Sequence, residues 1–201
     1  KLVIGHCPLV TNTCLSYLQG KLRVLDISHC NQFTDESFSY LQGTIEELNI
    51  SRCTTLSDKA FSYLRGLKVL KMNGCNQKTL SDKALSYLQG SITVLDISGV
   101  RVFTDVGFSY LQGTIRVLNM YGCNQSTITD KAFSYLKDSI RWLDMSCCDQ
   151  SSITEKAFLE LSESQISTLV LNCPNTKVVT HSLLKRFSPR VSIETDCTLD
   201  P

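Results

Sequence analysis

Cysteine and histidine are the residue types in this sequence that could carry out chemistry, since it contains ten cysteines and three histidines. Their thiolate and imidazole groups bind zinc and act as nucleophiles or bases. His6 and His29 each stand directly before a cysteine, and Asp26 would add a carboxylate, but no clear third or fourth metal ligand follows. The sequence has no Cys-x-x-Cys pair, no glycine-rich phosphate loop and no serine–histidine arrangement. We therefore expect no metal, no cofactor and no catalytic site.

The segments that position these residues repeat along the chain. The stretch Val24-Leu25-Asp26-Ile27-Ser28-His29-Cys30 returns at 47–53, 69–75, 94–100, 117–123 and 142–148, with looser copies at 2–7 and 168–174. The spacing between equivalent positions is 23, 23, 22, 25, 23, 25 and 26 residues. A fixed period in this range is typical of a solenoid built from stacked units.

Each repeat has two halves. Apolar residues two apart, as at Leu25 and Ile27, predict a short strand with one buried face. Thr34 and Asp35 then predict a helix start, because threonine can cap the first turn and aspartate suits the helix dipole there. Gly43 predicts the helix end. The same signals predict helices near residues 12–18, 35–42, 58–65, 82–89, 105–112, 130–137 and 155–162.

One such unit is too small to bury its own apolar face, so neighbouring units must stack. Stacking predicts an α/β solenoid of about eight repeats, with a parallel sheet on one face and helices on the other. We expect a single domain over residues 1–201, with a C-terminal cap over 175–201 that includes a short closing strand at 191–194. No such cap precedes the first repeat, so we expect a fragment of a longer chain that makes a contact through its N-terminal edge.

Six cysteines fall at one repeat position, which faces the predicted core: Cys7, Cys30, Cys53, Cys75, Cys123 and Cys148. Val100 holds the same position in another repeat, so this position requires a small apolar group more than a thiol. Reduced, buried cysteines are typical of intracellular proteins, and we expect a cytoplasmic location. Cys147 and Cys173 are expected on the rim, where their thiols could be exposed.

The repeats match the leucine-rich-repeat pattern, in which leucines at fixed spacing precede an asparagine or cysteine. They most resemble the cysteine-containing subfamily, whose helix start reads as Ile128-Thr129-Asp130 does here. The resemblance implies a horseshoe-shaped solenoid with its sheet on the concave face and its helices on the convex face. It also implies a protein-binding role, because this subfamily is best known as the substrate receptor of F-box proteins in ubiquitin ligases. The second cysteine that usually follows the helix in this subfamily is absent, and no F-box is present.

The side chains that point outward from the strands vary between repeats, as expected of a binding surface. Outward residues of neighbouring strands lie about 4.8 Å apart, so equivalent positions form continuous columns. The residues expected to bind a partner are Val24, Glu47, Val69, Val94, Val117 and Trp142 in a first column; Asp26, Asn49, Lys71, Asp96, Asn119 and Asp144 in a second; and Tyr121 in a third. Trp142 and Tyr121 are the expected anchors. Alternatively, valine simply suits a strand, and the first column stays in water.

Charge and hydropathy restrict the choice of partner. With 20 basic and 19 acidic residues the net charge is +1, which gives no electrostatic reason to expect nucleic acid or an anionic membrane surface as partner. No apolar run approaches the roughly 18 residues needed to span a bilayer. We expect a non-enzymatic module that binds a protein or peptide. The alternative is a structural scaffold subunit whose apolar column is permanently covered in an assembly.

Overall fold

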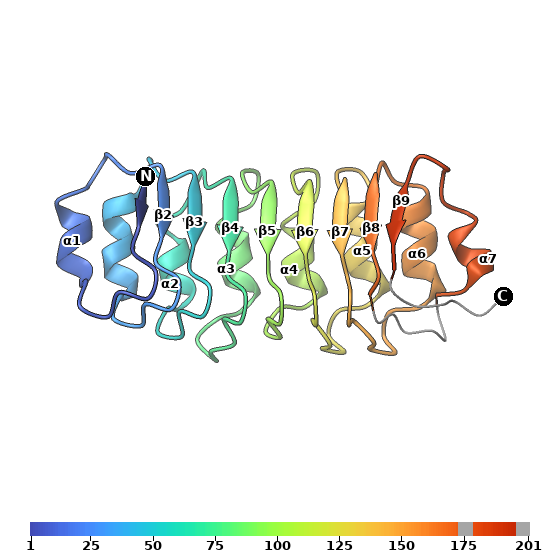
Figure 1. Ribbon diagram of the computed structural model, residues 1–201, viewed down its shortest axis with the longest axis horizontal. Coiled ribbons are helices and arrows are strands. Elements are labelled where there is room, and N and C mark those ends of the chain that lie inside the picture. The colour runs from blue at the N-terminus through green and yellow to red at the C-terminus, as the bar shows by residue number, and fades with distance from the viewer. Residues whose placement is uncertain (173–178, 196–201) are drawn as a thin grey trace.

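The computed structural model describes residues 1–172 and 179–195, and its strands form one parallel sheet (Figure 1). The strands lie side by side in the order in which they occur along the chain. They are β1 (Leu2–Val3), β2 (Val24–Asp26), β3 (Glu47–Asn49), β4 (Val69–Lys71), β5 (Val94–Asp96), β6 (Val117–Asn119), β7 (Trp142–Asp144), β8 (Thr168–Val170) and β9 (Ser192–Glu194). The predicted parallel sheet is therefore confirmed, and the predicted closing strand is β9.

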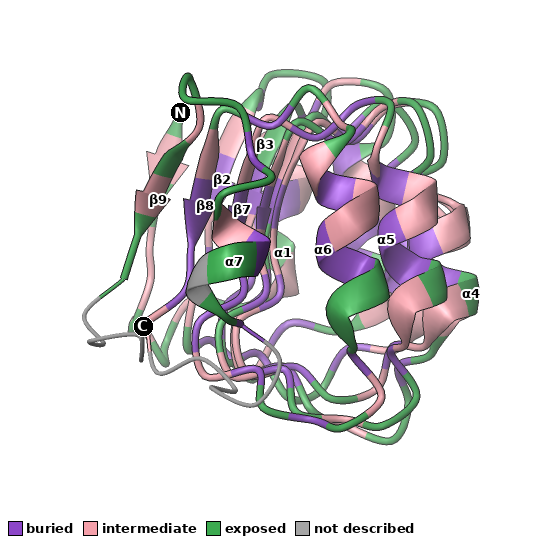
Figure 2. Ribbon diagram, turned by 90° about the vertical axis from the view of Figure 1, so that its right-hand side faces the viewer, coloured by how far each residue is buried: buried purple, intermediate pink, exposed green. Residues whose placement is uncertain are grey.

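A helix follows each of the first eight strands, and these helices cover one side of the sheet (Figure 2). They are α1 (Asn12–Ser16), η1 (Asp35–Leu41), α2 (Asp58–Phe61), α3 (Asp82–Ser86), α4 (Asp105–Ser109), α5 (Asp130–Leu136), α6 (Glu155–Ser162) and α7 (His181–Leu184). Several end earlier than predicted. Just after α2, the N–H of Leu64 donates to the carbonyl of Phe61 three residues earlier, so the turn beyond Phe61 is held by a 3-10-type bond.

The core lies between the sheet and the helices. The central leucines of six successive strands pair in register and form one buried line, as predicted. They are Leu25, Leu48, Leu70, Leu95, Leu118 and Leu143, and each is at most 2% exposed. Tyrosines from successive helices pack against the edge of this core and stay partly exposed, as at Tyr40 and Tyr63. Among the described residues, no helix has the length and apolar character that crossing a membrane requires.

The column cysteines also connect neighbouring repeats. Cys30, Cys53, Cys75, Cys123 and Cys148 are buried and unpaired with other sulfurs, whereas Cys7 is partly exposed. Each buried thiol donates a hydrogen bond to a backbone carbonyl of the preceding repeat, as from Cys53 Sγ to the oxygen of Ile27 at 3.1 Å. Burial raises the pKa of Cys53 to about 12. The thiol thus supplies a weak donor as well as the small apolar volume that the sequence predicts.

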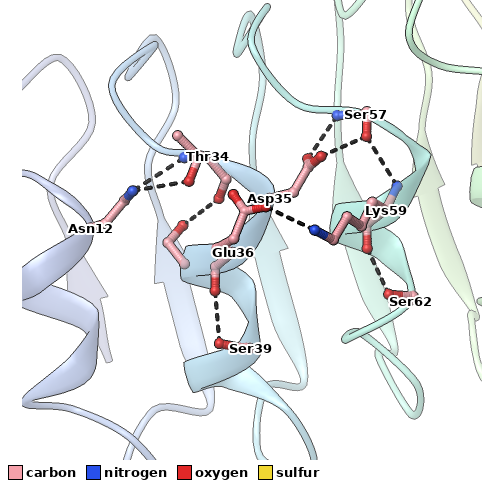
Figure 3. Close-up of polar contacts among 9 residues, drawn as sticks. Asn12, Thr34, Asp35, Glu36, Ser39, Ser57, Lys59 and Ser62 are labelled. Atoms are coloured by element: carbon pink, nitrogen blue, oxygen red, sulfur yellow. Dashed lines mark hydrogen bonds and ion pairs between the residues drawn. The ribbon is translucent and has the colours of Figure 1, made fainter.

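The helix starts are linked by a second ladder of hydrogen bonds (Figure 3). Asp35 accepts one bond from the backbone N–H of Ser57 at 2.8 Å and one from its hydroxyl at 2.6 Å. Beside it, Lys59 Nζ lies 2.8 Å from Glu36 of the preceding repeat, and this pairing lowers the pKa of Glu36 to about 2. The same pair of hydrogen bonds recurs between Asp58 and Ser81, Asp82 and Thr104, Asp105 and Thr129, and Asp130 and Thr154.

The first link of this ladder differs. Asn12 stands where later repeats have aspartate, and its amide donates to the Thr34 hydroxyl at 3.0 Å while its oxygen accepts the Thr34 N–H at 3.1 Å. Thr34 makes no side-chain cap bond to η1, which is a 3-10 helix. The prediction that Thr34 caps its helix is therefore wrong. Its hydroxyl oxygen accepts from Asn12, whereas the equivalent Ser57 accepts from the N–H of Lys59.

The structure describes the predicted C-terminal cap only over residues 179–195. There α7 follows the last full repeat, and β9 pairs with β8 in parallel, with Leu169 opposite Ile193. Residues 175–178 and 196–201 of the predicted cap, together with Cys173, lie outside the described residues. The described part of the cap therefore continues the repeat pattern by one strand and one short helix.

Candidate protein-binding face of the sheet

The predicted binding residues are brought together on the side of the sheet opposite the helices. Parallel pairing places Val24, Glu47, Val69, Val94, Val117 and Trp142 in one row across six strands. The same register places Asp26, Asn49, Lys71, Asp96, Asn119 and Asp144 in a second row. We call the first row the apolar row and the second the polar row. The helices lie on the far side of the sheet from both (Figure 2).

The apolar row is only half open to solvent. Its valines and Trp142 are partly buried, and Glu47 is exposed. Trp142 lies between Val117 and Thr168 in the strand register, as expected; it is partly buried and is not among the exposed large side chains. Tyr121, which follows β6, is 49% exposed and is the more accessible of the two expected anchors.

The third predicted column does not form a uniform surface. Ser51 and Ser146 fall in it but are only 7% and 1% exposed. The hydroxyl of Ser146 accepts the backbone N–H of Asn172 at 2.9 Å, and the hydroxyl of Ser51 donates to Asn49 at 2.6 Å. These serines are therefore structural, and Tyr121 is the member of the column that presents a large side chain.

The polar row closes the turns that follow the strands. The side-chain oxygen of Asp96 accepts the backbone N–H of Ser98 at 3.0 Å, and Asp144 accepts that of Ser146 at 2.8 Å. Asp26, Asn49 and Asn119 make the same bond two residues ahead. This is the turn that aspartate and asparagine form with their own backbone. These residues therefore have a structural task that the sequence interpretation did not assign to them.

Asp26 shows how this task affects the charge of the sheet face. Partial burial alone would raise the pKa of its carboxyl group, but bonds from the Ser28 backbone and hydroxyl, a bond from Asn49 and the charge of Lys71 together lower it. The Asn49 amide donates to Asp26 at 2.9 Å across neighbouring strands. Asp26 thus stays ionised well into the acidic range, and the sheet face keeps a negative charge near Lys71.

A shallow depression lies at the N-terminal half of this face. Its volume is about 170 Å³, and its lining includes Val24, Glu47, Val69 and Lys71. Asp26 and Asn49 complete the set of predicted residues that line it. The apolar side chains of Val24 and Val69 here lie beside the charged side chains of Glu47 and Lys71, both of which are exposed. The sheet face therefore has two parts, this depression and the aromatic pair Trp142 and Tyr121.

The two histidines near the N-terminus do not form a metal site. The rings of His6 and His29 stack with centroids 3.9 Å apart and planes 25° apart. Ring nitrogens bind metals through lone pairs in the ring plane, so stacked rings do not aim at a common point. Within residues 1–172 and 179–195, no group of three or more histidine, cysteine, aspartate or glutamate side chains could hold a metal ion.

The histidines stand at a left-handed backbone position that recurs after the strands. His6, His29, Arg52 and Cys147 have φ between 54° and 62° there. Gly74, Gly99 and Gly122 hold the same position in other repeats, with φ of 66° to 69°. Such values suit glycine and strain other residues. Cys147 thus lies on the rim as predicted, but its side chain is only partly exposed.

The sequence interpretation overlooked a polar cavity at the rim where helices lead into strands. Its volume is about 470 Å³, and its lining includes Lys21, Arg23, Arg65 and Lys68. The sequence did contain a sign of this cavity. In each repeat one residue directly precedes the member of the apolar row, and this residue is basic at positions 23, 68, 116 and 141. The net charge of the whole chain does not reveal this cluster, because acidic residues elsewhere balance its basic residues.

Comparison with known proteins supports the fold. Neither a scan against models of protein families nor a search of curated protein sequences finds a match. Among solved structures, Rad7 from the yeast Rad7–Elc1 complex aligns with a TM-score of 0.61 and 18% identity over 96% of this chain and 63% of that chain. TLR13 from its complex with ssRNA13 aligns with a TM-score of 0.65 and 21% identity over 92% of this chain and 27% of that chain.

A third structure, the Toll–Spatzle complex of Drosophila, gives a TM-score of 0.54 and 13% identity over 96% of this chain and 30% of that chain. This chain thus spans less than two thirds of each of these proteins. At such identities the likeness concerns the fold. The repeat period, the parallel register and these neighbours together identify the chain as a leucine-rich-repeat solenoid.

Proposed function

We propose that this chain is a non-enzymatic recognition module that binds a protein or peptide on its sheet face. The observation that carries this proposal is the apolar row, a band of partly exposed valines that ends at Trp142 and crosses six strands. Burying such a band against a partner removes apolar surface from water. Tyr121 and Trp142 provide aromatic side chains of the type that dominate binding energy in interfaces.

A protein suits this surface better than a small molecule or a nucleic acid. The depression of about 170 Å³ is smaller than the roughly 300–1,000 Å³ of usual small-molecule sites. Asp26, Glu47, Asp96 and Asp144 give the face a negative character, which repels phosphate backbones. Rad7 and Toll, which share the fold, were each solved in complex with another protein, whereas TLR13 was solved with single-stranded RNA.

The finer role within this proposal is that of the substrate-receptor repeats of an F-box-type ubiquitin ligase in the cytoplasm. It is supported by the resemblance to the cysteine-containing repeats, through the column cysteines and Ile128-Thr129-Asp130. The buried, unpaired thiols suit a reducing compartment. A partner whose ubiquitination depends on this chain in cells would support the role, and a partner whose modification is unchanged when the chain is removed would oppose it.

A structural scaffold subunit is the second candidate, and the first repeat favours it. Val3, Leu9 and Tyr17 are 60%, 92% and 76% exposed, more than large apolar side chains in the middle of the solenoid. Light scattering after gel filtration separates the two roles. A recognition module stays monodisperse when isolated, whereas an obligate subunit associates or aggregates through its exposed apolar residues.

The direct test is affinity capture from cells with matched variants. Tyr121→Ala and Trp142→Ala remove the aromatic side chains of the sheet face. Val106→Ala is the control, because Val106 is 55% exposed on α4, on the opposite side of the molecule. The proposal predicts proteins that both sheet-face variants lose and the control retains. Equal capture by all three variants, each shown to be folded, would contradict it.

A further inference from the structure

The rim cavity between helices and strands has the size of a ligand site. Its volume of about 470 Å³ falls within the range of roughly 300–1,000 Å³ seen for small-molecule sites. It spans the first three repeats, at the edge of the molecule where the chain starts in Figure 1. The loop that follows α2 contributes to it and is shorter than its neighbours, since Leu67 follows Gly66 directly, whereas one residue separates Gly43 from Ile45.

The cavity holds an excess of positive charge. Lys21, Arg23, Arg65 and Lys68 line it, and Glu46 is the one acidic residue of the lining. Glu46 pairs with Arg23. Within the described part of the chain, the other three cations form no ion pair, so their charges are left for a ligand. An anion bound here would meet three uncompensated positive charges inside one cavity.

The later repeats show that the fold itself does not require these cations. Gln89 and Gln112 stand where Arg65 does, and Ser91 and Thr114 stand where Lys21 does, at the same kind of helix end. Cations can stabilise a helix C-terminus, but these repeats form theirs with neutral residues. The fold therefore forms this kind of helix end without cations at the positions of Lys21 and Arg65.

The basic residues farther along this rim are occupied within the protein. Arg116 donates to the backbone oxygen of Ser139 at 2.8 Å. Arg141 donates to the oxygens of Ser139 and Ile140 at 3.2 and 3.0 Å. Lys68, at the position equivalent to these arginines, makes no side-chain hydrogen bond within the described residues. The contrast separates structural cations from cations that are available for binding.

Backbone N–H groups add hydrogen-bond donors to the basic side chains of the cavity. Gly20, Gly43 and Gly66 line the cavity with φ of 72°, 77° and 91°. Their N–H groups make no hydrogen bond to residues in the described part of the chain, and apart from each glycine and its two chain neighbours no described atom lies within 4 Å of where a Cβ would stand. Unpaired N–H groups beside cationic side chains are the two donor types that bind phosphate oxygens.

We propose that this cavity binds a compact polyphosphate group, meaning two or more phosphates close together on one ligand. Three free cations exceed what a single phosphate needs, and their placement around one cavity suits neighbouring phosphates. The group could belong to a small polyphosphate molecule or to a peptide with adjacent phosphorylated residues, and both share this chemistry. The site is separate from the sheet face, so its test does not depend on whether the protein-binding proposal is correct.

Calorimetric titration of the 201-residue chain with inorganic pyrophosphate tests the site. We expect saturable binding that is tighter than for orthophosphate and that weakens as salt rises. Lys21→Gln, Arg65→Gln and Lys68→Gln should each lower the affinity roughly 10-fold, because each removes a charged donor. Lys83→Gln is the matched control, since this exposed lysine on α3 lies outside the lining and changes the net charge equally.

Glu46→Gln gives a test in the opposite direction. Removing the carboxylate releases Arg23 and removes a negative charge from the lining, so pyrophosphate should bind more tightly. A gain in affinity would exclude loss of structure as the cause of the change, because a variant that loses structure would not bind more tightly. Unchanged or weaker binding by folded Glu46→Gln protein would count against the cavity.

Amide NMR spectra locate the ligand. Pyrophosphate should shift the amide signals of Gly20, Gly43 and Gly66 and leave those of Gly90 and Gly113, which hold the same backbone position outside the lining, in place. A peptide with two adjacent phosphoserines, titrated in parallel, identifies the source by whichever ligand binds more tightly. If neither ligand binds, or if Gly90 and Gly113 shift as much as the cavity glycines, the proposal is overturned.

Discussion

The carboxylate of Asp35 holds Ser57 of the next repeat at two points, the backbone N–H at 2.8 Å and the hydroxyl at 2.6 Å. Because the aspartate only accepts, the Ser57 oxygen remains free to accept the N–H of Lys59 and cap α2. Asn12, the equivalent residue in the first repeat, donates to Thr34 instead, and that cap bond is missing. The stacking of repeats and the capping of helices are thus one linked network.

Asn12→Asp should therefore stabilise the protein. An aspartate would accept both the N–H and the hydroxyl of Thr34, and the Thr34 oxygen could then cap η1. A restored cap contributes about 0.5–2 kcal/mol. Urea unfolding at pH 7 measures the gain, which should vanish in a Thr34→Ala background. A lower stability of Asn12→Asp than of the wild type would show that the aspartate ladder does not control capping.

Thiol labelling should separate the column cysteines from the others. Burial raises the pKa of Cys53 to about 12, of Cys75 to about 11 and of Cys123 to about 12, so almost no thiolate exists at pH 8. These thiols should react with a disulfide reagent only as fast as the protein opens, whereas the partly exposed Cys147 reacts faster. Peptide mass mapping identifies each site. Rapid labelling of Cys75 in folded protein would place that column outside the core.

The same pKa shift predicts a loss of stability at alkaline pH. The folded-state pKa of Cys53, about 12, lies above the roughly 8.5 of an unfolded cysteine. Its contribution to stability is therefore complete below about pH 8.5 and is lost as the pH rises toward 12. Cys53→Val should reduce the drop in unfolding free energy between pH 7.5 and 10, since Val100 already fills the equivalent position. An identical drop in both proteins would exclude this cause.

The pKa of His29 should lie below that of an ordinary imidazole. Partial desolvation, then the charges of His6 and Arg52, lower the pKa of His29, while Asp26 opposes them. Proton NMR of the imidazole signals should place the pKa of His29 below its usual value of about 6.5. His6→Ala should raise it. A pKa of His29 that is unchanged in His6→Ala would show that the stacking observed at 3.9 Å has no electrostatic effect.

Leu143 and Trp142 are neighbours in β7 with different roles, and their truncation should differ accordingly. Leu143 is fully buried, so Leu143→Ala should cost about 2–5 kcal/mol of stability. Trp142 is partly buried on the sheet face, and Trp142→Ala should cost about 1 kcal/mol. Urea unfolding measures both. A larger loss for Trp142→Ala than for Leu143→Ala would make the tryptophan part of the core.

Repetition explains why the fold could be predicted from the sequence. The register of Leu25 with Leu48 and of Val24 with Glu47 follows from the period alone, because a shift by one residue would turn every leucine outward. The helix ends were less predictable. Residues such as Tyr63 and Leu64 continue the helical pattern, but their bonds three residues back end α2 at Phe61.

The placement of the candidate residues on the sheet face was predictable, but their contacts were not. The sequence places Asp96 and Asp144 on the sheet face, yet their bonds to Ser98 and Ser146 depend on the turn geometry after each strand. The rim cavity depends on which cations find partners. Lys68 and Arg116 hold equivalent positions, and only the three-dimensional contacts show that Arg116 donates to Ser139 whereas Lys68 forms no side-chain hydrogen bond or ion pair within the described residues.

The most direct test of the sheet face as a binding surface is the dissociation constant of a captured partner for the wild type, Trp142→Ala and Val106→Ala. Truncating an aromatic anchor typically costs about 2–4 kcal/mol of binding, which is roughly 30- to 1,000-fold in affinity. We predict a loss in this range for Trp142→Ala and less than about 3-fold for Val106→Ala, on the helix side. Unchanged affinity of folded Trp142→Ala, with a loss for Val106→Ala, would place the binding surface on the helices and contradict the account.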